Sequence, residues 1–142
     1  MADDEAIGAL NQVLSEVIDV VSEVKQARRK VPGAHPLHGQ IDQLSNDLGA
    51  WAGRLMVQDD ALGVSPLASM PSVAGRTPLN LWPGSPTDEE VCQLLDDHLA
   101  RLEGHVTSAS DRQTDEGSRA ALDEVHAGIA AHRDALRHIK EL

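Results

Sequence analysis

The stretch LHGQIDQLSNDLGAWAGRLMVQDDALG, residues 37–63, decides the fold class of this chain. Its apolar residues recur at alternating three- and four-residue steps, which place them on one face of an α-helix. They are Ile41, Leu44, Leu48, Trp51, Leu55 and Leu62. Pro36 stands at the start of the predicted helix, where its missing N–H costs no hydrogen bond. Gly63 follows the last apolar residue and marks the end of the helix. We therefore predict one helix of about seven turns.

The composition predicts an aliphatic core. The chain has 142 residues, with two Trp and no Phe or Tyr. This length fits a single domain over residues 1–142 that is large enough to bury a core. Because the apolar residues are mostly Leu, Val, Ile and Ala at helical spacing, they favour an all-α bundle.

The charge of the chain is strongly acidic. Twelve Lys and Arg stand against 23 Asp and Glu, a net charge of −11 with neutral histidines. This balance opposes phosphate binding, excludes DNA binding by a lysine-rich tail, and leaves carboxylates that attract cations. There is one cysteine, and neither a signal peptide nor a membrane-spanning apolar run is apparent. We expect a cytoplasmic protein with no membrane contact.

Three further segments carry a helical pattern. The first starts at Asp3 and Asp4 and ends in a basic cluster at 25–30, charges that suit the two ends of a helix dipole. The next opens with the capping box 87–90, and the last starts between 114 and 118. Their inward-facing residues are Ile7, Leu10, Leu14, Val17, Val21 and Val24; Val91, Leu94, Leu95, His98, Leu102, His105 and Val106; and Leu122, Val125, Ile129, His132, Leu136 and Ile139.

The connections between these segments are short, long and short. VPGAHP joins the first two helices, and the polar residues 108–114 join the last two. The stretch 64–86 holds five of the seven prolines and is a crossover, which lets the second and third helices run parallel on a diagonal. We expect SPLASM to form a short helical turn, and apolar residues to hold the crossover against the bundle: Leu67, Met70, Leu79, Leu81 and Trp82. The prediction is an all-α, ferritin-like, up-down four-helix bundle.

Several motifs resemble the Dps family, the miniature ferritins that assemble as hollow dodecamers. They are LHGQIDQL…ALG in the second helix, LNQVLSEV…QARRKVPG in the first, DDHLARL in the third and AAHRDALR in the fourth. The last looks like the family's KHAWMLR signature, and the crossover PLASM…SPTDEEV is also similar. The resemblance covers nearly the whole chain. It implies a homo-oligomer, a dodecamer if that assembly is retained, that handles iron.

The resemblance also implies where iron would bind. Dps proteins oxidise iron between two subunits, with a histidine near the end of the first helix. The partner's second helix supplies a His, an Asp four residues later and an Asp-x-x-x-Glu pair about four turns further on. His38 and Asp42 match the first two of these second-helix ligands. They are the predicted residual metal ligands, with iron as the metal.

The other ligands of that centre are absent. Arg28 or Arg29 stands in place of the first-helix histidine, and the acidic pair falls on Gly53 and Val57. A guanidinium does not release its proton to become a ligand, and iron needs hard oxygen donors with balancing charge. We expect the usual ferroxidase centre to be lost and the protein not to be an enzyme. If it were active, it would be a ferroxidase-type oxidoreductase.

Other polar residues allow more than one interpretation. His38 and Asp42 share one helical face and could hold a metal or simply form a polar pair. Asp59 and Asp60 could replace the missing carboxylates if the register slips. Asp123-x-x-His126 is the one match to a classical di-iron motif.

The remaining histidines and the cysteine are also ambiguous. His98 and His105 lie about 10 Å apart along one helix, too far to chelate one ion. They and His132 could bridge helices by hydrogen bonds, pair with each other or His126 around a metal, or form pH-sensitive contacts. Cys92 is expected to be a buried or interfacial thiol.

The sequence therefore predicts an oligomeric protein for iron sequestration or stress protection that lacks the usual catalytic centre. Two alternatives remain open, because a fold alone does not define a function. One is an interaction or structural protein that binds a partner through an exposed apolar patch at 79–82. The other is an active ferroxidase with relocated ligands.

Overall fold

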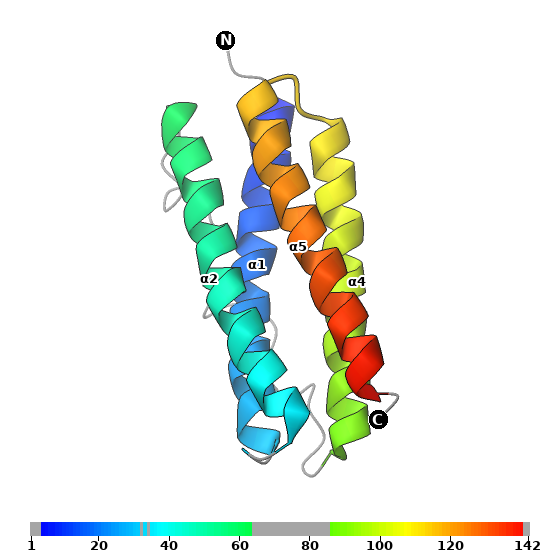
Figure 1. Ribbon diagram of the computed structural model, residues 1–142. Coiled ribbons are helices and arrows are strands. Elements are labelled where there is room, and N and C mark those ends of the chain that lie inside the picture. The colour runs from blue at the N-terminus through cyan, green and yellow to red at the C-terminus, as the bar shows by residue number, and fades with distance from the viewer. Residues whose placement is uncertain (1–3, 32, 34, 64–85, 141–142) are drawn as a thin grey trace.

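The computed structural model describes residues 4–31, 33, 35–63 and 86–140. This part of the chain forms four long helices and contains no strand (Figure 1). They are α1 (Asp4–Lys30), α2 (Pro36–Ala61), α4 (Asp88–Asp111) and α5 (Glu116–Lys140). The all-α prediction is confirmed, and each of the four predicted long helices is present.

The helices form a four-helix bundle with two helices running in each direction (Figure 1). Helices α1 and α5 run in one direction, and α2 and α4 run in the opposite direction (Figure 1). The main contacts are α1 with α2, α2 with α5, α5 with α4, and α4 with α1. The second and third long helices are therefore parallel and lie on a diagonal, as predicted. The crossover 64–85 lies outside the described residues, and so do the predictions for SPLASM and for its apolar residues: Leu67, Met70, Leu79, Leu81 and Trp82.

Local chemistry explains where the helices begin. At the start of α4, the Thr87 hydroxyl accepts a hydrogen bond from the Glu90 N–H at 3.1 Å. The Glu90 carboxylate accepts one from the Thr87 N–H at 3.2 Å. This is the predicted capping box. At the start of α2, His35 Nδ1 accepts from the Leu37 N–H at 3.0 Å, and Pro36 occupies the first turn.

The core is aliphatic and lies between all four helices. The predicted stripe of α2 is buried over Ile41, Leu44, Leu48, Trp51 and Leu55, while Leu62 packs at its edge. The indole of Trp51 lies against Gly128 of α5, where an added Cβ would be 2.3 Å from Cζ2. A glycine inside α5 is therefore required by this close approach, although it weakens the isolated helix.

Two predictions of local detail were wrong. Helix α4 continues to Asp111, because Ala109 and Ser110 are buried and the Ser110 hydroxyl donates to Asp123 of α5 at 2.8 Å. In α1, Ile7 is only half-buried, whereas Val13 and Val20 are buried and Val21 packs at the edge of the core. Helix α1 packs against both α2 and α4, so its buried face is wider than one heptad stripe.

Candidate functional site

The structure brings together the predicted residual metal ligands and one of the arginines. His38 Nδ1 lies 3.6 Å from the Asp42 carboxylate, one turn apart on α2. From α1, Arg28 Nε donates to the same carboxylate at 2.5 Å. Arg28, rather than Arg29, is therefore the residue that faces this position, and its positive charge neutralises Asp42.

The other positions at which the inter-subunit centre was expected carry no metal ligand in this chain. Gly53 is exposed and Val57 is 62% exposed, so the outer face of α2 bears no carboxylate there. Asp59 is fully buried and Asp60 is exposed, so Asp59 does not share the surface on which Asp42 lies. Within the described ranges, no three His, Cys, Asp or Glu side chains come together as ligands for one metal ion.

All seven histidines of the chain lie beside a carboxylate. Two pairs are within one helix: His38 with Asp42 and His138 with Asp134. Five pairs join different segments: His35 with Asp88, His98 with Glu23, His105 with Glu16, His126 with Glu103, and His132 with Asp47. Of the interpretations that the sequence left open for the histidines, the structure therefore favours contacts with carboxylates that bridge helices.

Two of these pairs follow one another between α1 and α4. His98 is buried and faces Glu23, and His105 Nδ1 lies 2.5 Å from Glu16. The two glutamates are seven residues apart on α1, and the two histidines are seven residues apart on α4. Because α1 and α4 are antiparallel (Figure 1), the earlier histidine faces the later glutamate. The expectation that His105 points inward was wrong. Its side chain is 49% exposed, since it lies at the edge of the stripe where α4 meets α1.

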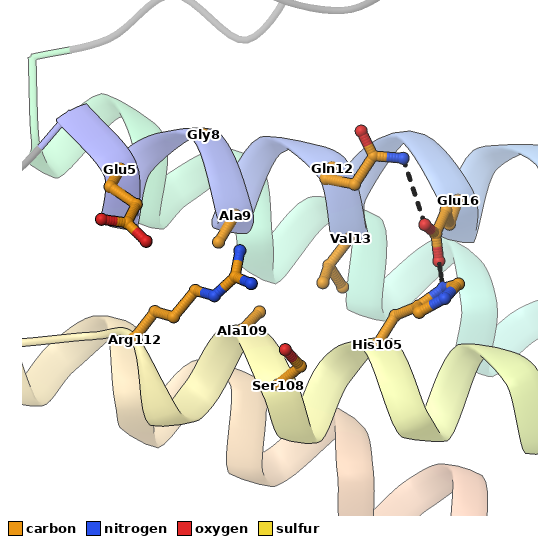
Figure 2. Close-up of a pocket in the computed structure, with 10 residues that line it drawn as sticks. All are labelled: Glu5, Gly8, Ala9, Gln12, Val13, Glu16, His105, Ser108, Ala109 and Arg112. Atoms are coloured by element: carbon orange, nitrogen blue, oxygen red, sulfur yellow. Dashed lines mark hydrogen bonds and ion pairs between the residues drawn. The ribbon is translucent and has the colours of Figure 1, made fainter.

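A groove runs along the same helix pair. A cavity of about 590 Å³ has Ala9, Val13 and Ala109 on its apolar wall. Figure 2 shows Arg112 and Glu5 at one end and His105 at the other. There Gln12 donates to Glu16 at 3.1 Å, and Glu16 contacts His105. A hollow of about 200 Å³ continues beside it with Asp19, Glu23, His98 and Arg101 among its lining residues.

His132 is held by two polar partners between α2 and α5. Its Nε2 lies 2.6 Å from the Asp47 carboxylate, and its Nδ1 lies 2.8 Å from the Gln40 amide nitrogen. We assign the proton of the neutral ring to Nε2, because the amide donates to Nδ1 and the carboxylate only accepts. The ring meets Trp51 edge-on, with centroids 5.9 Å apart and an interplanar angle of 78°.

The partial di-iron motif has a different role. Asp123 accepts a hydrogen bond from Ser110, and His126 lies 3.6 Å from Glu103. The same Glu103 and Asp96 each accept from Arg133 at 2.8 Å. The two hydrogen bonds raise the pKa of the Arg133 guanidinium, and the bond to Asp96 has the larger effect. The motif residues therefore take part in α4–α5 contacts.

Two buried groups have raised pKa values. The pKa of Asp59 is raised to about 6, mainly by burial and to a smaller extent by the negative charge of Asp60. Burial raises the pKa of the Cys92 thiol, and its Sγ donates to the Leu136 carbonyl at 3.2 Å. Cys92 is thus the buried thiol that the sequence predicted.

Sequence reasoning found the histidines but not their partners. Glu16, Glu23, Asp47 and Gln40 were missed, because they lie beside the apolar stripes where charged residues are ordinary. The usable signal was the matching seven-residue spacing, from Glu16 to Glu23 and from His98 to His105.

Comparison with known proteins identifies the fold. No protein-family model and no curated protein matches this sequence. A solved structure does match, with a TM-score of 0.80 and 10% identity over 99% of this chain. It is a two-domain protein from Anabaena variabilis with DJ-1/ThiJ/PfpI-like and ferritin-like domains, and the match covers 37% of its chain. At this identity the match shows a ferritin-like four-helix fold. None of the described helices is long and apolar enough to cross a membrane.

Proposed function

We propose that the protein is an oligomeric, Dps-like ferritin-fold protein that sequesters iron on its carboxylates without oxidising it at that family's inter-subunit centre. The observation that carries the proposal is the Arg28–Asp42 ion pair of 2.5 Å. It puts a permanent positive charge on the carboxylate that the resemblance assigns to iron. We place this activity in the cytoplasm, as protection against iron-driven stress.

The charges around the pair support the part of the proposal that concerns the absence of catalysis. An iron centre needs anionic oxygen ligands whose charge balances the metal. Here Asp42 is already neutralised and His38 is uncharged in its ligand form, so the pair offers Fe²⁺ little binding energy. The excess of acidic over basic residues supports the remaining part of the proposal, because surface carboxylates attract cations without oxidising them.

The proposal is tested by measuring particle size, iron oxidation and iron retention on one preparation. Size-exclusion chromatography with light scattering gives the particle mass, and absorbance follows aerobic Fe²⁺ oxidation on the same fraction. We expect a dodecamer-sized particle that retains iron and oxidises it no faster than buffer. Arg28→His restores the missing imidazole and removes the guanidinium, so it should increase oxidation. Arg29→His is the matched control and should change nothing.

Two outcomes would contradict the proposal. A large particle that oxidises Fe²⁺ well above the buffer rate would establish the alternative of an active ferroxidase with relocated ligands. A monomer or dimer that retains no iron would remove sequestration altogether.

The second of these outcomes would favour an interaction or structural protein on the same scaffold. Two observations support this candidate. The described residues hold no group of three side chains suited to one metal ion. The Anabaena protein carries a ferritin-like domain together with a domain of another type, so such a bundle also occurs as a module. The apolar patch predicted at 79–82 lies outside the described residues.

A further inference from the structure

The groove between α1 and α4 is lined in its middle by short side chains. Ala9 and Val13 of α1 and Ala109 of α4 form its apolar wall, and Gly8 also lines it. A Cβ added at Gly8 would meet no atom within 4 Å. The volume of the cavity is about 590 Å³, and pockets for small ligands usually have roughly 300–1,000 Å³. The groove therefore has room for an organic molecule.

One end of the groove carries a cation without an anionic partner. Arg112 follows the last residue of α4, and Figure 2 shows its side chain extended across the groove toward Ala9 of α1. The C-terminal end of a helix favours a cation, but it does not require the side chain to point at the neighbouring helix. Within the described residues, the guanidinium makes neither an ion pair nor a hydrogen bond. Its N–H donors are thus available to a carboxylate, which a guanidinium binds through two parallel bonds.

The opposite end of the groove carries hydrogen-bond acceptors. The Glu16 carboxylate accepts from the Gln12 amide at 3.1 Å and lies 2.5 Å from His105 Nδ1. A carboxylate has about four lone-pair sites, so Glu16 keeps about two for a ligand. Because the carboxylate only accepts, the neutral His105 ring donates through Nδ1 and keeps a lone pair on Nε2. An ammonium group, with three N–H donors and a positive charge, matches this end of the groove.

We propose that this groove binds a short zwitterionic peptide, with its terminal carboxylate on Arg112 and its terminal ammonium at Glu16. The two ends of the groove are seven residues apart on α4, from His105 to Arg112, which is a rise of about 10 Å. An extended peptide spans about 3.3–3.6 Å per residue, so three residues cover this distance. Small apolar side chains of the peptide then lie against the apolar wall.

The charges of the groove favour a zwitterion over a simple anion or a simple amine. Glu5 lies at the same end as Arg112, and the chain has a net charge of −11, so an anion alone is repelled. An amine alone satisfies Glu16 but leaves the Arg112 guanidinium without an acceptor. A ligand that carries both charges, about 10 Å apart, satisfies both ends at once.

The test measures the binding of trialanine to the full chain by isothermal titration calorimetry and by NMR of the isotopically labelled protein at low salt. We expect a Kd on the order of 0.1–1 mM for a ligand of this size. Shift changes should concentrate at residues 5–16 and 105–112. Trialanine amide lacks the carboxylate, and acetyl-trialanine lacks the ammonium. Each should bind about tenfold more weakly, because each loses one charge-assisted contact.

Two variants and a matched control locate the site. Arg112→Gln should weaken trialanine binding about tenfold and remove the preference for trialanine over its amide. Arg101→Gln is the control, because it removes the same charge from α4 three turns away, outside this cavity. It should leave the Kd unchanged. Gly8→Leu fills the groove without changing a charge and should abolish binding, while its open surroundings and better helix propensity preserve the fold.

Three results would overturn the proposal. They are no binding at about 10 mM trialanine, an amide that binds as tightly as trialanine, and an Arg112→Gln variant with unchanged affinity. Shift changes that concentrate outside the groove would also overturn it. Equal binding of acetyl-trialanine would leave a site for a carboxylate alone and would refute the role of Glu16. The comparison of trialanine with its two blocked forms uses the parent protein, so it decides the question even if a variant does not fold.

Discussion

Replacing Asp59 with Asn should stabilise this protein at neutral pH. The Asp59 side chain is fully buried at the end of α2. Burial, and then the charge of Asp60, raises its pKa from 3.8 to about 6. At about 1.4 kcal/mol per pH unit, the difference corresponds to at most about 3 kcal/mol lost when the carboxylate ionises inside the fold. Asn has the same shape and no charge, so we expect Asp59→Asn to recover about 1–3 kcal/mol at pH 7.

The pH dependence of this gain has a defined sign. Between about pH 4 and pH 6 the folded protein holds the Asp59 proton more tightly than the unfolded chain does. The free energy of unfolding therefore falls as the pH rises through this window and is constant above it. Asp59→Asn should differ most from the parent protein at pH 7 and least at pH 4.

Urea unfolding followed by circular dichroism at pH 4 and pH 7 measures this difference. Asp60→Asn is the matched control, because Asp60 is exposed and raises the pKa of Asp59 only through its charge. It should give a smaller gain at pH 7. A loss of stability in Asp59→Asn, or a gain of equal size at both pH values, would refute the reasoning, because the carboxylate would then contribute through its contacts and not through its buried charge.

Two further substitutions test packing and charge by the same measurement. Gly128→Ala places a Cβ 2.3 Å from Trp51 and should lower the free energy of unfolding by about 1–3 kcal/mol. Its control is Gly104→Ala in α4, where the added Cβ meets no atom within 4 Å. This control should raise the free energy of unfolding by about 0.5–1 kcal/mol. A stabilising Gly128→Ala would contradict the Trp51 contact. Arg133→Gln leaves Asp96 and Glu103 without their cation and should cost about 1–3 kcal/mol. The exposed Arg137→Gln on the same helix should change little, and equal effects would rule out a special role for Arg133.

Helix positions were predictable because their signals are local. The stripe from Ile41 to Leu55 and the capping box at Thr87 each depend on residues within a few turns of one another. The end of α4 was not predictable in this way. Ser108–Asp111 has the composition of a turn, but the helix continues there because Ser110 packs against α5 and bonds to Asp123. Contacts between helices overrode the local preference.

The candidate site was predictable only within single helices. The spacing of His38 and Asp42 places them one turn apart whatever surrounds them. The choice between Arg28 and Arg29 depends on the rotation of α1 against α2, and neighbouring residues point about 100° apart on a helix. The same limit applies to Glu16 and Glu23. Their match to the two histidines becomes visible only once α1 and α4 are known to be antiparallel neighbours.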